Sequence, residues 1–299
     1  MLDVIGIGTN SVDEVLQVPL GAVPSGGKVR IGDRRFLCGG QTATVMAACA
    51  ALGLRSGYVG AFGSDEHGRL IRNALTHSGV DVSDSIECDA PNRGAVILVD
   101  PLGNRTVLWH RSDRLKLPLE RLPPSAMRAR IVHVDDDDPE LALNAVTSAR
   151  HAGMVVTSDL EHMSDSAERL IASVTYPIFE QNLPTSITGE GDPERALRKL
   201  RRLNGGILVM TRGELGSVAL DGDAFHVVPA FKVNVVDGTG AGDVFRAGFI
   251  FGLLQTWAVP DILRFANAAA ALSCTRLGAI PSVPELGEVQ VLLASQPRA

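Results

Sequence analysis

A glycine-rich turn in the C-terminal third of the chain carries the residues best suited to chemistry. An apolar strand-like run, 233–236, leads into residues 237–243, DGTGAGD, and an apolar helical run follows. Glycines let successive backbone N–H groups point into one space, and a helix start adds positive potential there. The turn therefore predicts an anion-binding pocket.

Asp243 falls in the first turn of the predicted helix, so its carboxylate can face the same pocket. A carboxylate in that place can accept a proton from an attacking hydroxyl, as a general base does in phosphoryl transfer. The alternative is that Asp243 only interacts with the helix dipole, which is worth about 0.3–1 kcal/mol. The spacing of the glycines alone does not separate these two interpretations.

Four consecutive acids, 135–138, directly follow the predicted strand 131–134. One of them is expected to cap the helix that begins near Pro139. Four exceed the needs of one cap, and in α/β folds the C-terminal ends of strands face the substrate crevice. Asp135 is therefore a candidate for the wall of a substrate pocket.

Composition excludes several other classes of function. The 299 residues carry a formal charge of −6, and 45% are hydrophobic, which disfavours nucleic acid as a partner and allows a large core. The basic run 195–202 alternates with leucines and is expected to be the solvated face of a helix.

Seven histidines and four widely spaced cysteines lack metal-site spacings. Without an export signal or an apolar span of about 20 residues, we expect a cytoplasmic protein without a membrane partner.

The order of the predicted elements indicates the fold class. Short β-branched runs alternate with stretches of helical period, which predicts an α/β fold with a doubly wound, mostly parallel sheet and helices on both faces. The expected strands are 4–7, 131–134, 154–157, 206–211 and 216–228. The expected helices are 43–52, 141–152, 166–174, 241–255, 260–275 and 284–293.

Two segments, 14–36 and 93–110, interrupt this alternation with turn signals between short extended runs. We expect them to form hairpins that pair with each other as a small β-sheet lid inserted in one domain that spans residues 1–299. The alternative is two unrelated surface loops. Lys28 and Asn104 in these segments are candidates for contacts with a substrate under the lid.

The complete string Asp-x-Thr-Gly-Ala-Gly-Asp after an apolar strand resembles the C-terminal signature of the ribokinase-like (PfkB) carbohydrate kinases. The resemblance implies a kinase that transfers phosphoryl from ATP, with Mg²⁺, to a sugar hydroxyl. It implies that Asp243 is the catalytic base and that the Gly240, Ala241 and Gly242 amides are its anion hole.

Other segments in the order typical of this family extend the resemblance over essentially the whole chain. For the substrate it implies Asp13, Gly39, Gly40, Thr44 and Asp237. For ATP it implies Asn182, Thr211, Gly213, Gly216 and Asn267. For a monovalent cation such as K⁺ it implies Asp237, Thr239, Ala279 and Ser282. The resemblance also implies a homodimer joined through the lids.

Three positions depart from the family pattern. Thr44 stands where the family usually has Asn, which removes one side-chain contact to the sugar. Thr185 stands where the family has the Glu that helps to hold the Mg²⁺ water shell. Gly238 replaces a common Thr, which is expected to loosen the turn while keeping its amides.

The acids at 135–138 would repel an anion, so we expect a neutral sugar. The overall pattern resembles the fructokinase and ketohexokinase side of the family, which implies a ketohexose or pentose, with fructose-like sugars first. A nucleoside kinase and a kinase for a 2-keto-3-deoxy sugar acid are the alternatives within the family. A non-catalytic sugar or nucleotide sensor is the alternative from another class, and the presence of a base at Asp243 argues against it.

Overall fold

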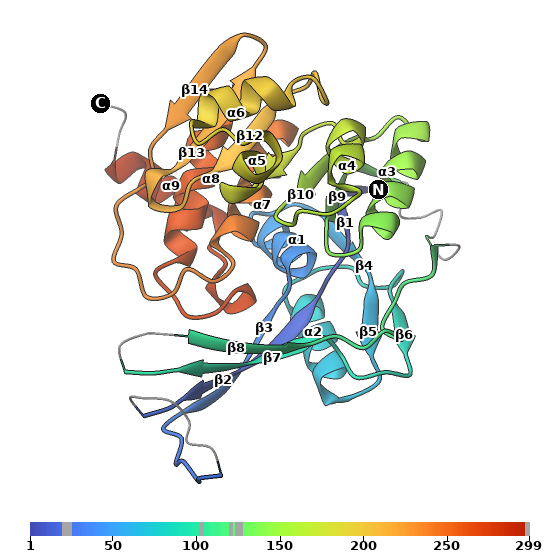
Figure 1. Cartoon of the computed structure of the whole chain (residues 1–299), viewed down its shortest axis with the longest axis vertical. Coiled ribbons are helices and arrows are strands. Elements are labelled where there is room, and N and C mark those ends of the chain that lie inside the picture. Colours follow the sequence, from blue (N-terminus) through green and yellow to red (C-terminus); the bar gives the residue numbers. More distant parts are fainter. Residues whose placement is uncertain (20–25, 102–104, 120–121, 123–127, 297–299) are drawn as a thin grey trace.

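Alternate residues of strand β1 (Leu2–Ile7) pack against helices on opposite faces of a central sheet. In the computed structural model, Val4 joins a core cluster with helices α1, α7 and α8, whereas Ile5 and Ile7 join a second cluster with α3, α4 and α6. This two-sided burial is typical of a strand inside a doubly wound sheet, and it confirms the predicted fold class (Figure 1).

The structure describes residues 1–19, 26–101, 105–119, 122 and 128–296. The strands are β1, β2 (Ser11–Gln17), β3 (Arg34–Gly39), β4 (Ser56–Val59), β5 (Ala61–Gly63), β6 (Ile86–Cys88), β7 (Gly94–Val99), β8 (Arg105–His110), β9 (Ala129–Asp135), β10 (Val155–Asp159), β11 (Ile178–Phe179), β12 (Leu208–Thr211), β13 (Ser217–Asp221) and β14 (Ala224–Val228). The α-helices are α1 (Gln41–Ala51), α2 (Glu66–His77), α3 (Pro139–His151), α4 (Ala167–Ser173), α5 (Asn182–Thr188), α6 (Pro193–Leu200), α7 (Ala241–Leu254), α8 (Val259–Ser273) and α9 (Leu286–Ser295).

The central sheet has a parallel half and a mixed half. Strands run in the order β10-β9-β1-β4, all parallel, and a second group runs β11-β12-β13-β14 with antiparallel pairs after β12. Isolated bridges from Thr157 to Tyr176 and from Leu160 to Phe179 connect β10 to the second group. The carboxyl ends of β1, β9 and β10 therefore lie at one edge, where a ligand site is expected.

A separate four-stranded sheet, which we call the small sheet, has the order β3-β2-β7-β8. Strand β2 pairs antiparallel with β3 and parallel with β7, and β7 pairs antiparallel with β8. The two predicted hairpins thus pair with each other, and the alternative of two unrelated loops is wrong. The small sheet projects from the body of the molecule in Figure 1.

The basic run lies largely on α6 and behaves as predicted. Leu197 and Leu200 are buried, while Arg198 pairs with Glu194 and Lys199 pairs with Glu190 on the solvent side. Among the described residues, no helix is long and apolar enough to cross a bilayer.

Candidate active site

Helix α7 begins at a point where the backbone is crowded on several sides. Its N-cap, Gly240, has φ 78°, and a Cβ there would lie 2.8 Å from the Cβ of Ala279. The N-cap of α1, Gly40, has φ 96°, and a Cβ there would lie 2.5 Å from the Cα of Asn10. Only glycine fits at either position, so the two helix starts can approach the same space.

Asp243 lies in the first turn of α7 and is buried. Burial raises the pKa of its carboxyl well above the ordinary value, the neighbouring Arg246 guanidinium opposes that rise, and Glu161 and Asp135 add to it. An anionic Asp243 is therefore costly and is stabilised chiefly by one buried cation. A carboxylate in this state has a strong tendency to accept a proton.

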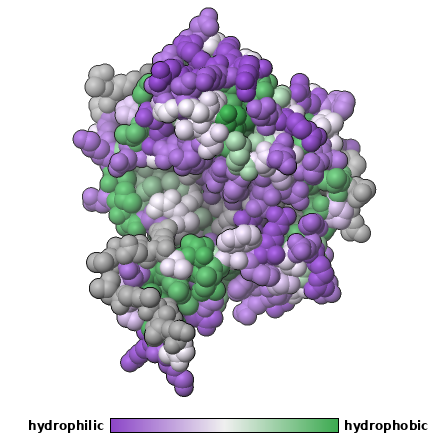
Figure 2. Space-filling model, in the orientation of Figure 1, coloured by the Kyte–Doolittle hydropathy of each residue, from purple (hydrophilic) through white to green (hydrophobic). Residues whose placement is uncertain are grey.

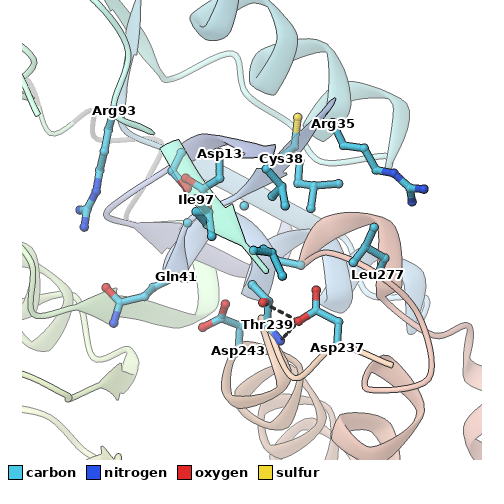
Figure 3. A pocket seen from close by; sticks show the side chains of 18 of the residues that line it. Asp13, Arg35, Cys38, Gln41, Arg93, Ile97, Asp237, Thr239, Asp243 and Leu277 are labelled. Carbon is cyan, nitrogen blue, oxygen red and sulfur yellow. Dashed lines mark hydrogen bonds between the residues drawn. The ribbon is translucent and has the colours of Figure 1, made fainter. Parts of the chain in front are cut away.

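A cavity of about 730 Å³ lies between the small sheet and the turn 237–243. Figure 3 shows Asp13 and Ile97 on the side of the small sheet, opposite Asp237, Thr239 and Asp243. We call it the first cavity. Its size suits a small polar molecule with room for part of a second one.

Four of the residues predicted to contact the substrate line the first cavity: Asp13, Gly39, Gly40 and Asp237. Asp13 accepts a hydrogen bond from the Ala95 amide at 3.1 Å. Burial raises the pKa of Asp13, and the Ala95 hydrogen bond and Arg93 oppose that rise. The small sheet thus delivers a partly buried carboxylate to the wall of the cavity.

Other predicted substrate residues are not brought to this cavity. Thr44 is buried beneath it, with its Oγ1 about 4.0 Å from a Cβ placed on Gly39. Lys28 is exposed and does not line the first cavity. Asn104 lies outside the described residues.

Asp135 does not reach the first cavity either, because strand β9 still includes it. Its Oδ2 accepts hydrogen bonds from the Thr9 amide, the Thr9 hydroxyl and the Thr42 hydroxyl at 2.7, 2.9 and 2.7 Å. The carboxylate therefore fixes the segment after β1 and the start of α1, and the expectation that it lines the sugar pocket is not met.

The remaining three acids of the run also have structural partners. Asp136 accepts hydrogen bonds from the Glu161 and His162 amides, both at 2.7 Å. Asp137 pairs with Arg93 and Arg111, and Asp138 caps α3. Each of the four acids therefore has structural partners within the chain.

A second cavity, of about 450 Å³, lies on the other side of the turn 237–243. Four of the five predicted ATP residues line it: Thr211, Gly213, Gly216 and Asn267. Gly240, Ala241 and Gly242 line it as well. The Ala241 amide donates to the Gly238 carbonyl at 3.2 Å, so within the turn this amide already has a partner.

Asn182 is exposed and does not line the second cavity; Glu180 does. Glu180 accepts hydrogen bonds from the Asn182 amide and side chain at 2.8 and 2.9 Å. A carboxylate is thus present on this wall, although position 185 lacks one. The feature of the sequence that could have marked Glu180 is its position directly after strand β11.

The predicted cation residues surround one loop. Asp237 accepts hydrogen bonds from the Thr239 amide and hydroxyl and from the Gly278 amide. Ser282 donates to the Ala279 carbonyl at 2.8 Å. The buried Asp237 carboxylate and these oxygen atoms are ligand types that a hard monovalent cation uses.

The two cavities meet at four shared residues: Gln41, Glu161, Gly240 and Asp243. The sequence did not single out Glu161. The Gln41 Nε2 is buried and makes no hydrogen bond within the part of the chain that the structure describes, so it is available to a ligand. Glu161 lies two residues beyond the end of β10, a position that could have marked it.

Comparisons with known proteins agree with this geometry. The chain is 27% identical to fructokinase-2 of Zea mays, over 97% of this chain and 94% of that protein. A crystal structure of a putative ribokinase from Agrobacterium tumefaciens superposes with a TM-score of 0.90 at 26% identity and covers 98% of both chains. Ribokinase of Arabidopsis thaliana, complexed with ribose and ATP, gives 0.86 at 25% identity and 98% of both chains.

The family model and these relatives identify the chain as an ATP-dependent phosphotransferase. The model of the pfkB family carbohydrate kinases matches residues 9–286, and the chain belongs to that family.

Proposed function

We propose that the protein transfers the γ-phosphoryl group of ATP to a hydroxyl of a small neutral carbohydrate, with a fructose-like ketohexose first and a pentose next. The observation that carries this proposal is the position of Asp243 in the walls of both cavities. A sugar in the first cavity and ATP in the second would meet at this carboxylate. Asp243 would then take the proton of the attacking hydroxyl as general base.

The rest of the site supports the transfer electrostatically. In the proposed complex, the amides at the start of α7 stabilise the negative charge of the phosphoryl group. Mg²⁺ bound to the ATP phosphates would neutralise further charge, and the Glu180 and Glu161 carboxylates in the second cavity suit its water shell. Gln41 would donate its Nε2–H groups where the two ligands meet.

The substrate preference rests on charge and on the relatives. Two arginines line the first cavity, and each already has a carboxylate partner: Arg93 pairs with Asp137 at 2.5 Å, and Arg35 pairs with Asp33 at 2.6 Å. An acidic sugar would have to compete with these partners and would meet Asp13 and Glu161 in the same wall. A neutral polyol avoids both costs, and a fructokinase is among the relatives.

The function is tested by ADP release in a coupled assay with fructose, ribose, a 2-keto-3-deoxy sugar acid and adenosine. We expect a larger kcat/KM for fructose than for the sugar acid, because a neutral sugar leaves the existing ion pairs intact. Among the neutral acceptors we expect fructose first, because a fructokinase is among the relatives. A clear preference for the sugar acid would refute the charge argument, and a preference for adenosine would indicate a nucleoside kinase. ATP binding without turnover of any acceptor would support a sensor.

Substitution of the proposed base gives a second test. Asp243→Asn should lower kcat by about 10²–10⁴-fold, because the isosteric amide cannot accept the proton. The base must be ionised, and burial raises its pKa above the ordinary 3.8. Wild-type kcat/KM should therefore fall as the pH is lowered through that raised value.

The Asn variant should keep wild-type ATP affinity by calorimetry and lose this acid limb of the pH profile. Near-wild-type turnover in Asp243→Asn would exclude Asp243 as the base.

We also propose that K⁺ binds beside Asp237, with Thr239, Ala279 and Ser282. A cation there would lie next to the turn that holds the transferring phosphoryl group, so activity should be higher in K⁺ than in a bulky tetraalkylammonium salt at matched ionic strength. The measurement is kcat/KM for ATP in the two salts. Equal values would contradict the cation site.

The small sheet is proposed to join two subunits in a homodimer. Strand β8 exposes Val107, Leu108 and Trp109, with 73% of Trp109 accessible, and apolar residues gather in this region of the surface in Figure 2. An apolar, unpaired edge of this kind is normally covered.

Light scattering at micromolar concentration should therefore give the mass of a dimer. Trp109→Arg should give a monomer, while Val291→Arg, which changes an exposed valine on α9, should leave the mass unchanged. A wild-type monomer with full activity would contradict this interface.

A further inference from the structure

Arg246 is the largest of the fully buried side chains, with 1% of its surface accessible. It lies on α7, one turn after Asp243, and lines the second cavity. Burial of a guanidinium costs several kcal/mol unless partners compensate for it. A cation kept at this place in the active site therefore requires an explanation.

Part of the compensation comes from two acids at the end of β10. The Arg246 Nη2 forms an ion pair with Asp159, which is also fully buried, and lies 3.6 Å from Glu161 Oε1. The ion pair with Asp159 is made by Nη2, one of the three guanidinium nitrogens. The Nε group is buried and makes no hydrogen bond within the described part of the chain.

The guanidinium also touches the proposed anion pocket. Its Nη1 lies 2.7 Å from the position that a Cβ on Gly242 would take. A side chain at position 242 would displace it, so the glycine leaves room for the cation against the backbone of the turn. The positive charge of Arg246 thus lies beside Gly242, in the wall of the second cavity.

We propose that Arg246 is a catalytic residue that donates hydrogen bonds to the non-bridging oxygens of the transferring phosphoryl group. The proposal rests on the proposed function. In the transfer, a bond forms between the sugar oxygen and the γ-phosphorus, and the bond to the β,γ-bridging oxygen breaks with its electron pair left on ADP. The hydroxyl proton passes to Asp243, and Arg246 keeps all its protons.

The alternative is that Arg246 only neutralises Asp159 within the core. The two roles differ in what removal of the cation does. If Arg246 only forms a structural ion pair, neutral residues at both 246 and 159 should leave turnover unchanged. If Arg246 contacts the phosphoryl group, turnover should fall when the arginine is removed, whichever residue stands at position 159.

The test compares Arg246→Met, Arg246→Lys and the double variant Asp159→Asn/Arg246→Met, which removes the unpaired buried carboxylate. Folding is checked by circular dichroism, and the Lys and double variants remain informative if the Met variant does not fold. We expect kcat to fall by about 10²–10³-fold in both Met variants. Added guanidinium ion should restore part of the activity of the double variant.

Calorimetry with ADP, AMP-PNP and ADP plus aluminium fluoride supplies a readout without turnover. ADP affinity should change by less than about threefold, whereas affinity for the other two probes should fall by about tenfold or more, the equivalent of about 1.4 kcal/mol. Wild-type kcat in the double variant, or equal losses for ADP and AMP-PNP, would overturn the proposal. If the wild type phosphorylates no acceptor, the proposed function fails, and the comparison of ADP with AMP-PNP still tests the contact.

Discussion

The site depends on one buried carboxylate whose partners are other parts of the chain. Asp135 ends strand β9 and accepts three hydrogen bonds, from Thr9 and Thr42. These bonds hold the segment after β1 and the start of α1 together, next to the entry of the small sheet and to Gly40. Burial raises the pKa of Asp135, and the hydrogen bonds oppose that rise. This polar contact therefore fixes the two segments that contribute Thr9, Gly40 and Gln41 to the first cavity.

The acidic and basic side chains around the site are held in hydrogen bonds and ion pairs with specific partners. Asp136 orders the loop that carries Glu161 and His162, and Asp137 fixes Arg93 and Arg111. The buried Arg246 is left to offset the acids closest to the point where the cavities meet. In the proposed function, Arg246 places one positive charge beside the turn where the ATP phosphates would bind, although the chain as a whole is acidic.

Local signals in the sequence predicted most of the fold and the turn that carries Asp243. Hydrophobic periodicity located the core helices, and glycines marked backbone positions that allow no side chain, as at Gly240. What the sequence did not reveal depends on long-range pairing. Asp135 ends a strand of the sheet, and its carboxylate is held there by Thr9 and Thr42. Glu180 lines the second cavity in place of Asn182. Arg246 gave no signal because it lies within an otherwise apolar helix.

The register of the small sheet has a mechanical consequence. Ser11 pairs with Gly39, Val12 with Gly94, and Gly94 with His110, so the ends of all four strands nearest the body form a single row. The small sheet is therefore attached to the body along that row, and its far end projects away from it. A strand of six residues is about 20 Å long, so a tilt of about 10° at the row would displace the far end by about 3 Å without breaking a hydrogen bond of the central sheet.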